Sequence, residues 1–281
     1  MKQRNGSVIL NAPYLLWAAL FIIVPLVFVG YYAFTTADGG FTFGNIVTFF
    51  TSETYMVVFW RSIVYAVWAT VICLVIAYPF AYCMTKLNLS AQKLMMLFVM
   101  LPMLMNLIVR TYSWQQILER NGLLNKLLEA LGFEPVIFLG NAAVIVFGMV
   151  YNYLPFMILP IYSVMSKVDN SLLEASSDLG CNAFSTVRRV IFPMSLPGVL
   201  SGITMVFVPC VSTFYISRQF SDGNIKMIGD VIEDKFYKSS VPDYNIGATI
   251  SLVLMVIIFI SLAVVNRFSD GDDIEGGGIV L

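Results

Sequence analysis

The chain has 281 residues, of which 59% are hydrophobic and only 12% are charged; in soluble globular proteins about 45–50% of residues are apolar and about 25% are charged. The net charge of −1 excludes a broadly basic surface, so no nucleic-acid partner is expected. Histidine is absent, which excludes Ser-His-Asp and Cys-His catalysis and metal sites that use histidine. The composition therefore predicts an integral membrane protein that lies in a lipid bilayer.

Charge-free stretches give the membrane spans, because a helix needs about 20 apolar residues to cross the bilayer. The third stretch is short, and we extend it past Arg110, whose long side chain is expected to reach the interface or a polar cavity. The expected fold is all-α and forms a single membrane domain over residues 1–281. Six transmembrane helices are predicted at residues 13–35, 60–85, 94–113, 137–164, 196–217 and 244–267.

The orientation follows from the basic residues at the first span. Lys2 and Arg4 precede it, and no basic residue follows until Arg61, which favours a cytoplasmic N-terminus. Six spans then place the C-terminus in the cytoplasm as well. The apolar run from Ala12 to Phe34 exceeds the core of a secretory signal, so the first helix is expected to be uncleaved.

Eight of the eleven prolines lie within the predicted spans. Each removes a backbone hydrogen bond and tends to bend its helix. Together they favour bent helices around a cavity over a straight anchor bundle. These prolines are Pro13, Pro25, Pro79, Pro102, Pro155, Pro160, Pro197 and Pro209.

Four segments outside the spans have sequence patterns that predict their local structure. Residues 38–59 begin with a Gly39-Gly40 turn, and residues 114–134 predict a short helix with one leucine-rich face. Residues 218–243 predict an amphipathic surface helix or re-entrant cap, with acidic residues opposite an apolar face. The Gly- and Asp-rich tail at 268–281 is expected to be disordered.

Residues 167–198 form the long cytoplasmic segment. Ser171 and Glu174 fit a capping box that would begin a helix, and Gly180 fits its C-terminal end. Asn182 can cap a second helix, which Pro193 would end. Two short helices meeting at a glycine elbow could dock into a groove on another protein.

This segment resembles the EAA loop of ABC-importer permeases, written EAA-x3-G-x9-I-x-L-P. Four residues match it directly, and three conservative substitutions complete the pattern. The matches are Glu174, Ala175, Gly180 and Pro193, and the substitutions are Ser176, Val190 and Phe192.

Four further segments extend the resemblance over nearly the whole chain: YPFAYCMTKL, LPMLMNLIVRTYSW, YNYLPFMILPIYSVMSKVDNSLLEASSDLG and IGDVIEDKF. They are similar to the spermidine/putrescine (PotB-like) permease family. The resemblance implies a type I importer (MetI-like) architecture in a bacterial cytoplasmic (inner) membrane. It also implies a second homologous permease, two cytoplasmic ATPase subunits, an extracytoplasmic binding protein and a polyamine cargo.

The chain lacks a nucleotide site of its own. It contains no Gly-Lys pair, so a phosphate-binding P-loop is excluded. We therefore expect a transport subunit that is not itself an enzyme and that has no cofactor or metal. In family terms, the loop at 170–193 couples it to the ATPases. The coupling candidates are Glu174, Ala175, Ser176, Gly180, Val190 and Pro193.

A polyamine pathway needs aromatic faces, carbonyl groups and acids that release the cargo again. No acidic residue lies in the middle of a predicted span. Acids of the last outer loop could form an entrance or meet the binding protein. The pathway candidates are Asn106, Tyr112, Trp114, Tyr151, Asn152, Tyr153, Tyr215, Asp230, Glu233 and Asp234.

Three alternatives remain open. A related importer for sulfate, thiamine or ferric iron would keep the machinery and change the cargo. A secondary transporter would need paired repeats or an ion-coupling carboxylate at mid-membrane, and neither is visible. A membrane-bound enzyme is disfavoured by the lack of histidine and of clustered catalytic acids.

Overall fold

A computed structural model describes residues 13–36, 38–238 and 243–273. Within these ranges the regular secondary structure is helical apart from one β-bridge, between Thr35 and Phe41, and the predicted all-α class is confirmed. Two compact units form. The first combines the described parts of residues 1–57 and 231–257, and the second those of residues 58–230 and 258–281.

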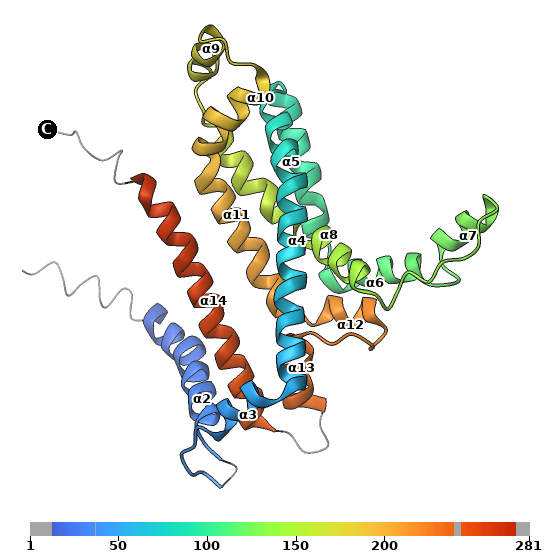
Figure 1. Cartoon of the computed structure of the whole chain (residues 1–281), viewed down its shortest axis with the longest axis vertical. Helices are drawn as coiled ribbons and strands as arrows, with labels where there is room; N and C mark the ends of the chain where they lie inside the picture. The colour runs from blue at the N-terminus through green and yellow to red at the C-terminus, as the bar shows by residue number, and fades with distance from the viewer. Residues whose placement is uncertain (1–12, 37, 239–242, 274–281) are drawn as a thin grey trace, which may run out of the picture. The chain divides into compact units, whose positions relative to one another are not determined.

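The helices are named in chain order (Figure 1), and η marks a π-helical turn. Their bounds are η1 (Ala19–Ile23), α2 (Val24–Ala33), α3 (Gly44–Thr51), α4 (Glu53–Thr85), α5 (Leu89–Leu104), α6 (Leu107–Leu118), α7 (Leu123–Ala130), α8 (Ala142–Met165), α9 (Asn170–Asp178), α10 (Ala183–Thr186), η2 (Val187–Ile191), α11 (Phe192–Ser212), α12 (Tyr215–Ser221), α13 (Ile228–Glu233), η3 (Asp234–Lys238) and α14 (Tyr244–Asp273).

In the first unit, two asparagines cap the C-terminal end of α2. The Asn45 side-chain amide donates to the carbonyls of Ala33 and Thr35 at 3.1 and 2.9 Å. Asn245, at the start of α14, donates to the Tyr32 carbonyl at 3.1 Å. These bonds satisfy carbonyls that a helix end leaves without partners. The predicted glycine turn is also present, because Gly39 has a φ of +82°.

In the second unit, α8 and α11 pack closely because glycines face their partners. A Cβ at Gly198 would lie 2.8 Å from the Pro160 carbonyl, and a Cβ at Gly202 would lie 2.7 Å from the Met157 sulfur. Two glycines four residues apart allow close approach of membrane helices. The sequence shows this spacing directly as Gly198 and Gly202, a signal from which the contact can be predicted.

The membrane spans agree with the prediction in number only if one bent pair counts as a span. Five described helices are long and apolar enough to cross a bilayer. A sixth span requires α5 and the helices after it, which meet at an 89° bend. The five helices are Pro13–Ala33, Glu53–Thr85, Ala142–Met165, Phe184–Ser212 and Tyr244–Val265.

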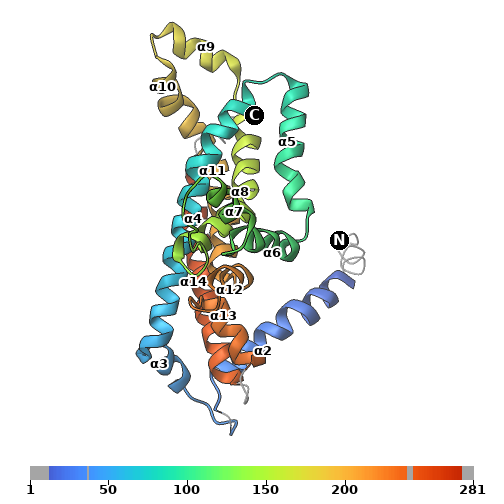
Figure 2. The ribbon, with the colours of Figure 1, turned by 90° about the vertical axis from the view of Figure 1, so that its right-hand side faces the viewer.

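The prediction of one continuous helix at 94–113 is wrong. α5 ends at Leu104, Met105 is extended, and Asn106 caps α6 by accepting the Ile108 N–H at 2.8 Å. Pro102 and this cap together favour a break. Figure 2 shows α6 turning away from the end of α5.

Two other boundaries differ from the prediction. The span predicted at 196–217 ends at Ser212, where Thr213 becomes extended, and α12 follows as a separate helix. The tail predicted to be disordered from residue 268 is helical as far as Asp273. Residues 274–281 lie outside the described residues.

Candidate functional site

The segment between α8 and α11 contains two short helices, as predicted, but the first begins differently. The Asp169 carboxylate accepts the backbone N–H of Ser171 at 3.0 Å, which is the contact of a helix N-cap. The predicted capping box of Ser171 and Glu174 is therefore wrong. Asp169 takes the position because its carboxylate is a stronger acceptor at the positive end of α9. The Glu174 side chain is exposed.

Gly180 forms the predicted elbow. Its φ of +80° lies in the left-handed region of backbone conformation, which residues other than glycine rarely adopt. The Cys181 N–H donates to the Ser176 carbonyl at 3.0 Å and closes the end of α9. No heavy atom lies within 4 Å of the position where a Cβ would be. Backbone conformation, and not lack of space, requires glycine here.

A pair of hydroxyl groups joins the two arms of the elbow. Ser176 and Thr186 are buried, and their side-chain oxygens lie 3.0 Å apart. Asn182 caps the second arm, as predicted, by accepting the Ser185 N–H at 2.8 Å. Ser176 stands where the family pattern has alanine, and its hydroxyl makes a bond that alanine could not.

The elbow presents apolar side chains on its outer surface. Leu179 is 85% exposed and Phe184 is 73% exposed, and Leu172 is exposed beside them. Ala175 is exposed as well. Exposed apolar groups on a short projecting helix pair are typical of a surface that docks into a groove. Figure 1 shows α9 and α10 at one end of α8 and α11.

The second arm continues into the membrane helix, and the prediction that Pro193 ends it is wrong. α10, η2 and α11 follow one another without a break, and residues Phe184–Ser212 count as one span. Proline cannot donate to the carbonyl four residues earlier. The π-helical turn Val187–Ile191 lies directly before Pro193 and accommodates this loss. The elbow and α11 are therefore joined without an intervening loop.

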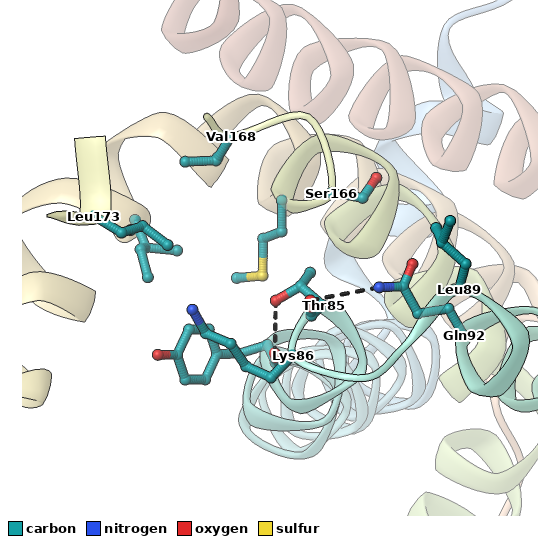
Figure 3. Close-up of a pocket in the computed structure, with 10 residues that line it drawn as sticks. Thr85, Lys86, Leu89, Gln92, Ser166, Val168 and Leu173 are labelled. Atoms are coloured by element: carbon teal, nitrogen blue, oxygen red, sulfur yellow. Dashed lines mark hydrogen bonds between the residues drawn. The ribbon is translucent and has the colours of Figure 1, made fainter. Parts of the chain in front are cut away.

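A cavity of about 210 Å³ lies beneath the elbow. Lys86 and Thr85 at the end of α4, Gln92 of α5 and Leu173 of α9 line it (Figure 3). The Lys86 ammonium lies 5.3 Å from the centre of the Tyr82 ring. The cavity separates part of α9 from the ends of α4 and α5.

A buried cation lies where α5 meets α6. Arg110 is only 7% exposed and donates from Nη1 to the Pro102 carbonyl. Its guanidinium carbon lies 5.6 Å from the centre of the Tyr151 ring. Trp114 packs edge-on against the same ring at 5.2 Å. The expectation that Arg110 reaches the interface is wrong for this chain, because the side chain is buried and folds back onto the end of α5. The alternative, a polar cavity, stays a prediction.

The other aromatic and amide candidates are dispersed. Asn106 is a helix cap, and the exposed Tyr112 points away from the packed interior. Asn152 is buried and donates to the Gly148 carbonyl at 2.8 Å. Tyr153 is half-buried. The Tyr215 hydroxyl accepts from Gln219 at 2.8 Å. Only Trp114 and Tyr151 of this set make a ring contact with each other in the described chain.

Asp230 does not lie on an exposed acidic face. It is 4% exposed and accepts from the Ser217 hydroxyl at 2.6 Å and from the Met227 N–H at 2.8 Å. Arg218 lies 3.8 Å from its other oxygen. The suggestion that Asp230 forms an entrance is therefore wrong, because its carboxylate organises the turn before α13.

Glu233 and Asp234 are half-buried. The residue that follows them, Lys235, forms an ion pair. The Lys235 ammonium donates to the Asp243 carboxylate at 3.2 Å. Burial lowers the pKa of Lys235, but hydrogen bonds with Tyr55 and Asp243 outweigh burial, and the pKa is raised overall. The roles predicted for Glu233 and Asp234 stay predictions.

The described residues contain no group of three or more His, Cys, Asp or Glu side chains that could hold a metal ion. The candidate site consists of a projecting elbow, a helix continuous with it, and an aromatic cluster around Arg110. Such an arrangement can transmit motion and contact a cation.

The comparison with protein families gives a match to the family described as "Binding-protein-dependent transport system inner membrane component" over residues 74–270. This match extends over well more than half of the chain. The chain belongs to the family of binding-protein-dependent transport inner membrane components. It is accordingly a transport component, and it contains the elbow and the aromatic cluster within the matched residues.

Curated relatives of this inner membrane component are spermidine/putrescine transport system permease proteins. The Haemophilus influenzae protein PotB is 34% identical over 259 residues, with 89% of this chain and 90% of the relative covered. The Escherichia coli protein PotB is 32% identical over 261 residues, with 90% and 94% covered. The predicted resemblance to this permease family is confirmed.

Solved structures show the same fold. A chain of a bacterial alginate ABC transporter, solved with a periplasmic protein bound to an alginate pentasaccharide, has a TM-score of 0.81 at 14% identity and 95% coverage of both chains. A chain of the MetNI methionine ABC transporter has a TM-score of 0.58 at 16% identity, with 79% of this chain and 99% of that chain covered. The predicted importer-permease architecture of this family member is confirmed.

Proposed function

We propose that the protein is the membrane-spanning permease subunit of an ATP-driven importer that moves polyamines into the cytoplasm. Separate ATPase subunits would supply the energy, and the elbow at 170–193 would transmit it. Alternating access would follow from motion of the bent helices around the pathway.

The continuity of the elbow with α11 carries this proposal. Leu179 and Phe184 are exposed on the elbow, and residues Phe184–Ser212 form one span. A partner that grips the exposed arm would therefore move a membrane helix without an intervening flexible joint. Gly180 sets the angle of the arm, and the bond between Ser176 and Thr186 stiffens it.

The remaining partners follow from the same proposal. A second homologous permease would complete the pathway, two ATPases would bind the two elbows, and an extracytoplasmic binding protein would deliver the cargo. This places the elbow and both termini in the cytoplasm, the orientation that Lys2 and Arg4 favour. Glu174, exposed on α9, would contact the ATPase.

Polyamine is the cargo favoured by the relatives and by the aromatic cluster. The PotB proteins are 31–34% identical to this chain, whereas a probable sulfate permease from Helicosporidium is 24% identical over 247 residues. Trp114 and Tyr151 offer π faces that attract ammonium groups. A sulfate pathway would gain nothing from such faces.

The test is uptake of radiolabelled spermidine by cells that lack other polyamine importers and that express this chain with its partner subunits. We expect saturable uptake that requires ATP hydrolysis and that excess putrescine inhibits. Uptake of labelled sulfate, thiamine and ferric citrate is measured in parallel. Uptake of one of these, without spermidine uptake, would replace the cargo. ATP-independent uptake in vesicles that contain the chain alone would overturn the importer mechanism.

A further inference from the structure

We propose that Tyr151, Trp114 and acceptor groups on α6 and α8 form a binding site for an alkylammonium group, and that Arg110 fills this site until the cargo displaces it. The inference deepens the proposed polyamine transport and rests on it. It assigns the cationic cargo a contact point within the chain and gives the buried arginine a role in release.

Arg110 already shows that the site accepts a cation. A guanidinium is permanently charged, and burying it requires compensation. Two groups supply this compensation: the Pro102 carbonyl, which accepts from Nη1, and the Tyr151 ring, whose centre is 5.6 Å away. The Trp114 ring packs edge-to-face against the Tyr151 ring, and its centre also lies 5.0 Å from the centre of the Phe147 ring.

The hydrogen bonding around Arg110 is incomplete. In the described chain, the buried Nε of Arg110 has no hydrogen-bond partner, and neither do the buried side-chain oxygens of Thr111 and Gln115 on α6 and of Asn152 beside Tyr151. Buried polar groups in native proteins are nearly always paired. These unpaired groups belong to α6 and to the residue that follows Tyr151 on α8, and we take them to indicate a second arrangement, in which they find partners.

An alkylammonium ion matches these unpaired groups better than a guanidinium does. It has three N–H donors and no acceptor, and the hydroxyl and amide oxygens of Thr111, Gln115 and Asn152 can accept them. The ammonium can also lie against an aromatic face. When it enters, Arg110 loses its position over Tyr151. Because Arg110 also ties α6 to the end of α5, its displacement would release the bend.

The test measures binding at the permease itself. Radiolabelled spermidine is dialysed to equilibrium against the purified complex of permeases and ATPases, without the binding protein, for the wild type and for Arg110→Met. Methionine keeps much of the length and removes the competing charge. We expect the dissociation constant to fall about tenfold, the scale of one desolvated cation–π contact. An unchanged or higher constant would overturn the inference.

A second pair of variants tests the ring directly and does not depend on how well Arg110→Met folds. Tyr151→Phe keeps the π face and should bind spermidine like the wild type, whereas Tyr151→Leu should bind it several-fold more weakly. Equal binding by the two variants would contradict the site. In the Tyr151→Leu background, Arg110→Met should no longer tighten binding, and a persistent gain would also contradict it.

The proposed function and this inference fail in different ways. If the wild-type importer takes up no polyamine in cells, the proposed function is wrong and the alkylammonium site is wrong with it. If the wild type takes up spermidine but the Arg110 and Tyr151 variants bind it unchanged, only the inference is wrong.

Discussion

Two sharp bends in the second unit have opposite constructions. At Gly180 the bend is exposed, and no heavy atom lies near the position of a Cβ. At Met105 and Asn106 the 89° bend is held by a buried arginine that reaches back to α5. The first bend is set by the backbone freedom of one residue, whereas the second is set by contacts between residues on different helices.

This difference shows how the same chain could form both the proposed lever and the proposed site. A bend that depends on one glycine can project from the membrane and present its surface to a partner. A bend that depends on packed side chains brings charged and aromatic groups together. The π-helical turn before Pro193 contributes to the lever because it keeps α10 and α11 continuous.

The largest effect is expected for Gly180→Val. A β-branched residue in the left-handed region is strained, so the elbow should lose its angle and uptake should fall about tenfold or more. Gly180→Asn is the matched control, because asparagine tolerates this region and space is available. Uptake and membrane abundance are measured together. Equal uptake by the valine and asparagine variants would contradict a backbone-determined lever.

The second-largest effect is expected in α11, the membrane helix that continues from the elbow. Gly202→Leu should force α11 away from Met157 and lower stability by about 2 kcal/mol, as overpacking does. Ser201→Leu places the same side chain on the exposed neighbouring position and should be tolerated. Thermal unfolding of the purified complex in detergent measures both. A smaller loss for Gly202→Leu than for Ser201→Leu would contradict the packing seen between α8 and α11.

Asn106→Ala tests the bend that depends on side chains. It removes the cap of α6 and should lower stability by about 1 kcal/mol. Because Arg110 still holds α6 to α5, spermidine binding should stay within about twofold of the wild type, a change below 0.5 kcal/mol. Asn106→Asp retains the acceptor and should unfold like the wild type. If spermidine binding were lost in Asn106→Ala but kept in Asn106→Asp, the cap and not Arg110 would determine this bend.

The smallest effect is expected for the hydroxyl pair of the elbow. A double-mutant cycle with Ser176→Ala and Thr186→Val should give a coupling of about 0.5–1 kcal/mol in stability. ATP hydrolysis stimulated by cargo should fall about twofold in each single variant, as expected for a loosened joint of this energy. Additive effects of the two substitutions would show that the 3.0 Å contact does not stiffen the elbow.

Sequence reasoning succeeded where a local signal determines the structure. Apolar length predicted the spans, Gly180 predicted the elbow, and Asn182 predicted the second cap. It failed where two local signals competed. Asp169, and not Ser171, caps α9. A π-helical turn forms before Pro193, and the helix continues where an end was predicted.

The sequence also misassigned two charged residues, for a common reason. Asp230 has helical spacing that places it on a polar face, yet Ser217, Arg218 and the Met227 N–H converge on it. Arg110 lies beside an apolar run, yet it turns inward to the Pro102 carbonyl near the end of α5. In both cases the deciding partner is distant in the chain or comes from an irregular turn.

By itself the sequence determined that this protein is an all-α membrane protein with a glycine elbow of the importer type, because apolar length, proline and glycine act through the nearest residues. Only the tertiary structure decided that the elbow continues into α11 and that Arg110 occupies an aromatic cluster. Those features depend on which carbonyls, rings and hydroxyl groups packing brings together, and no single stretch of sequence contains that information.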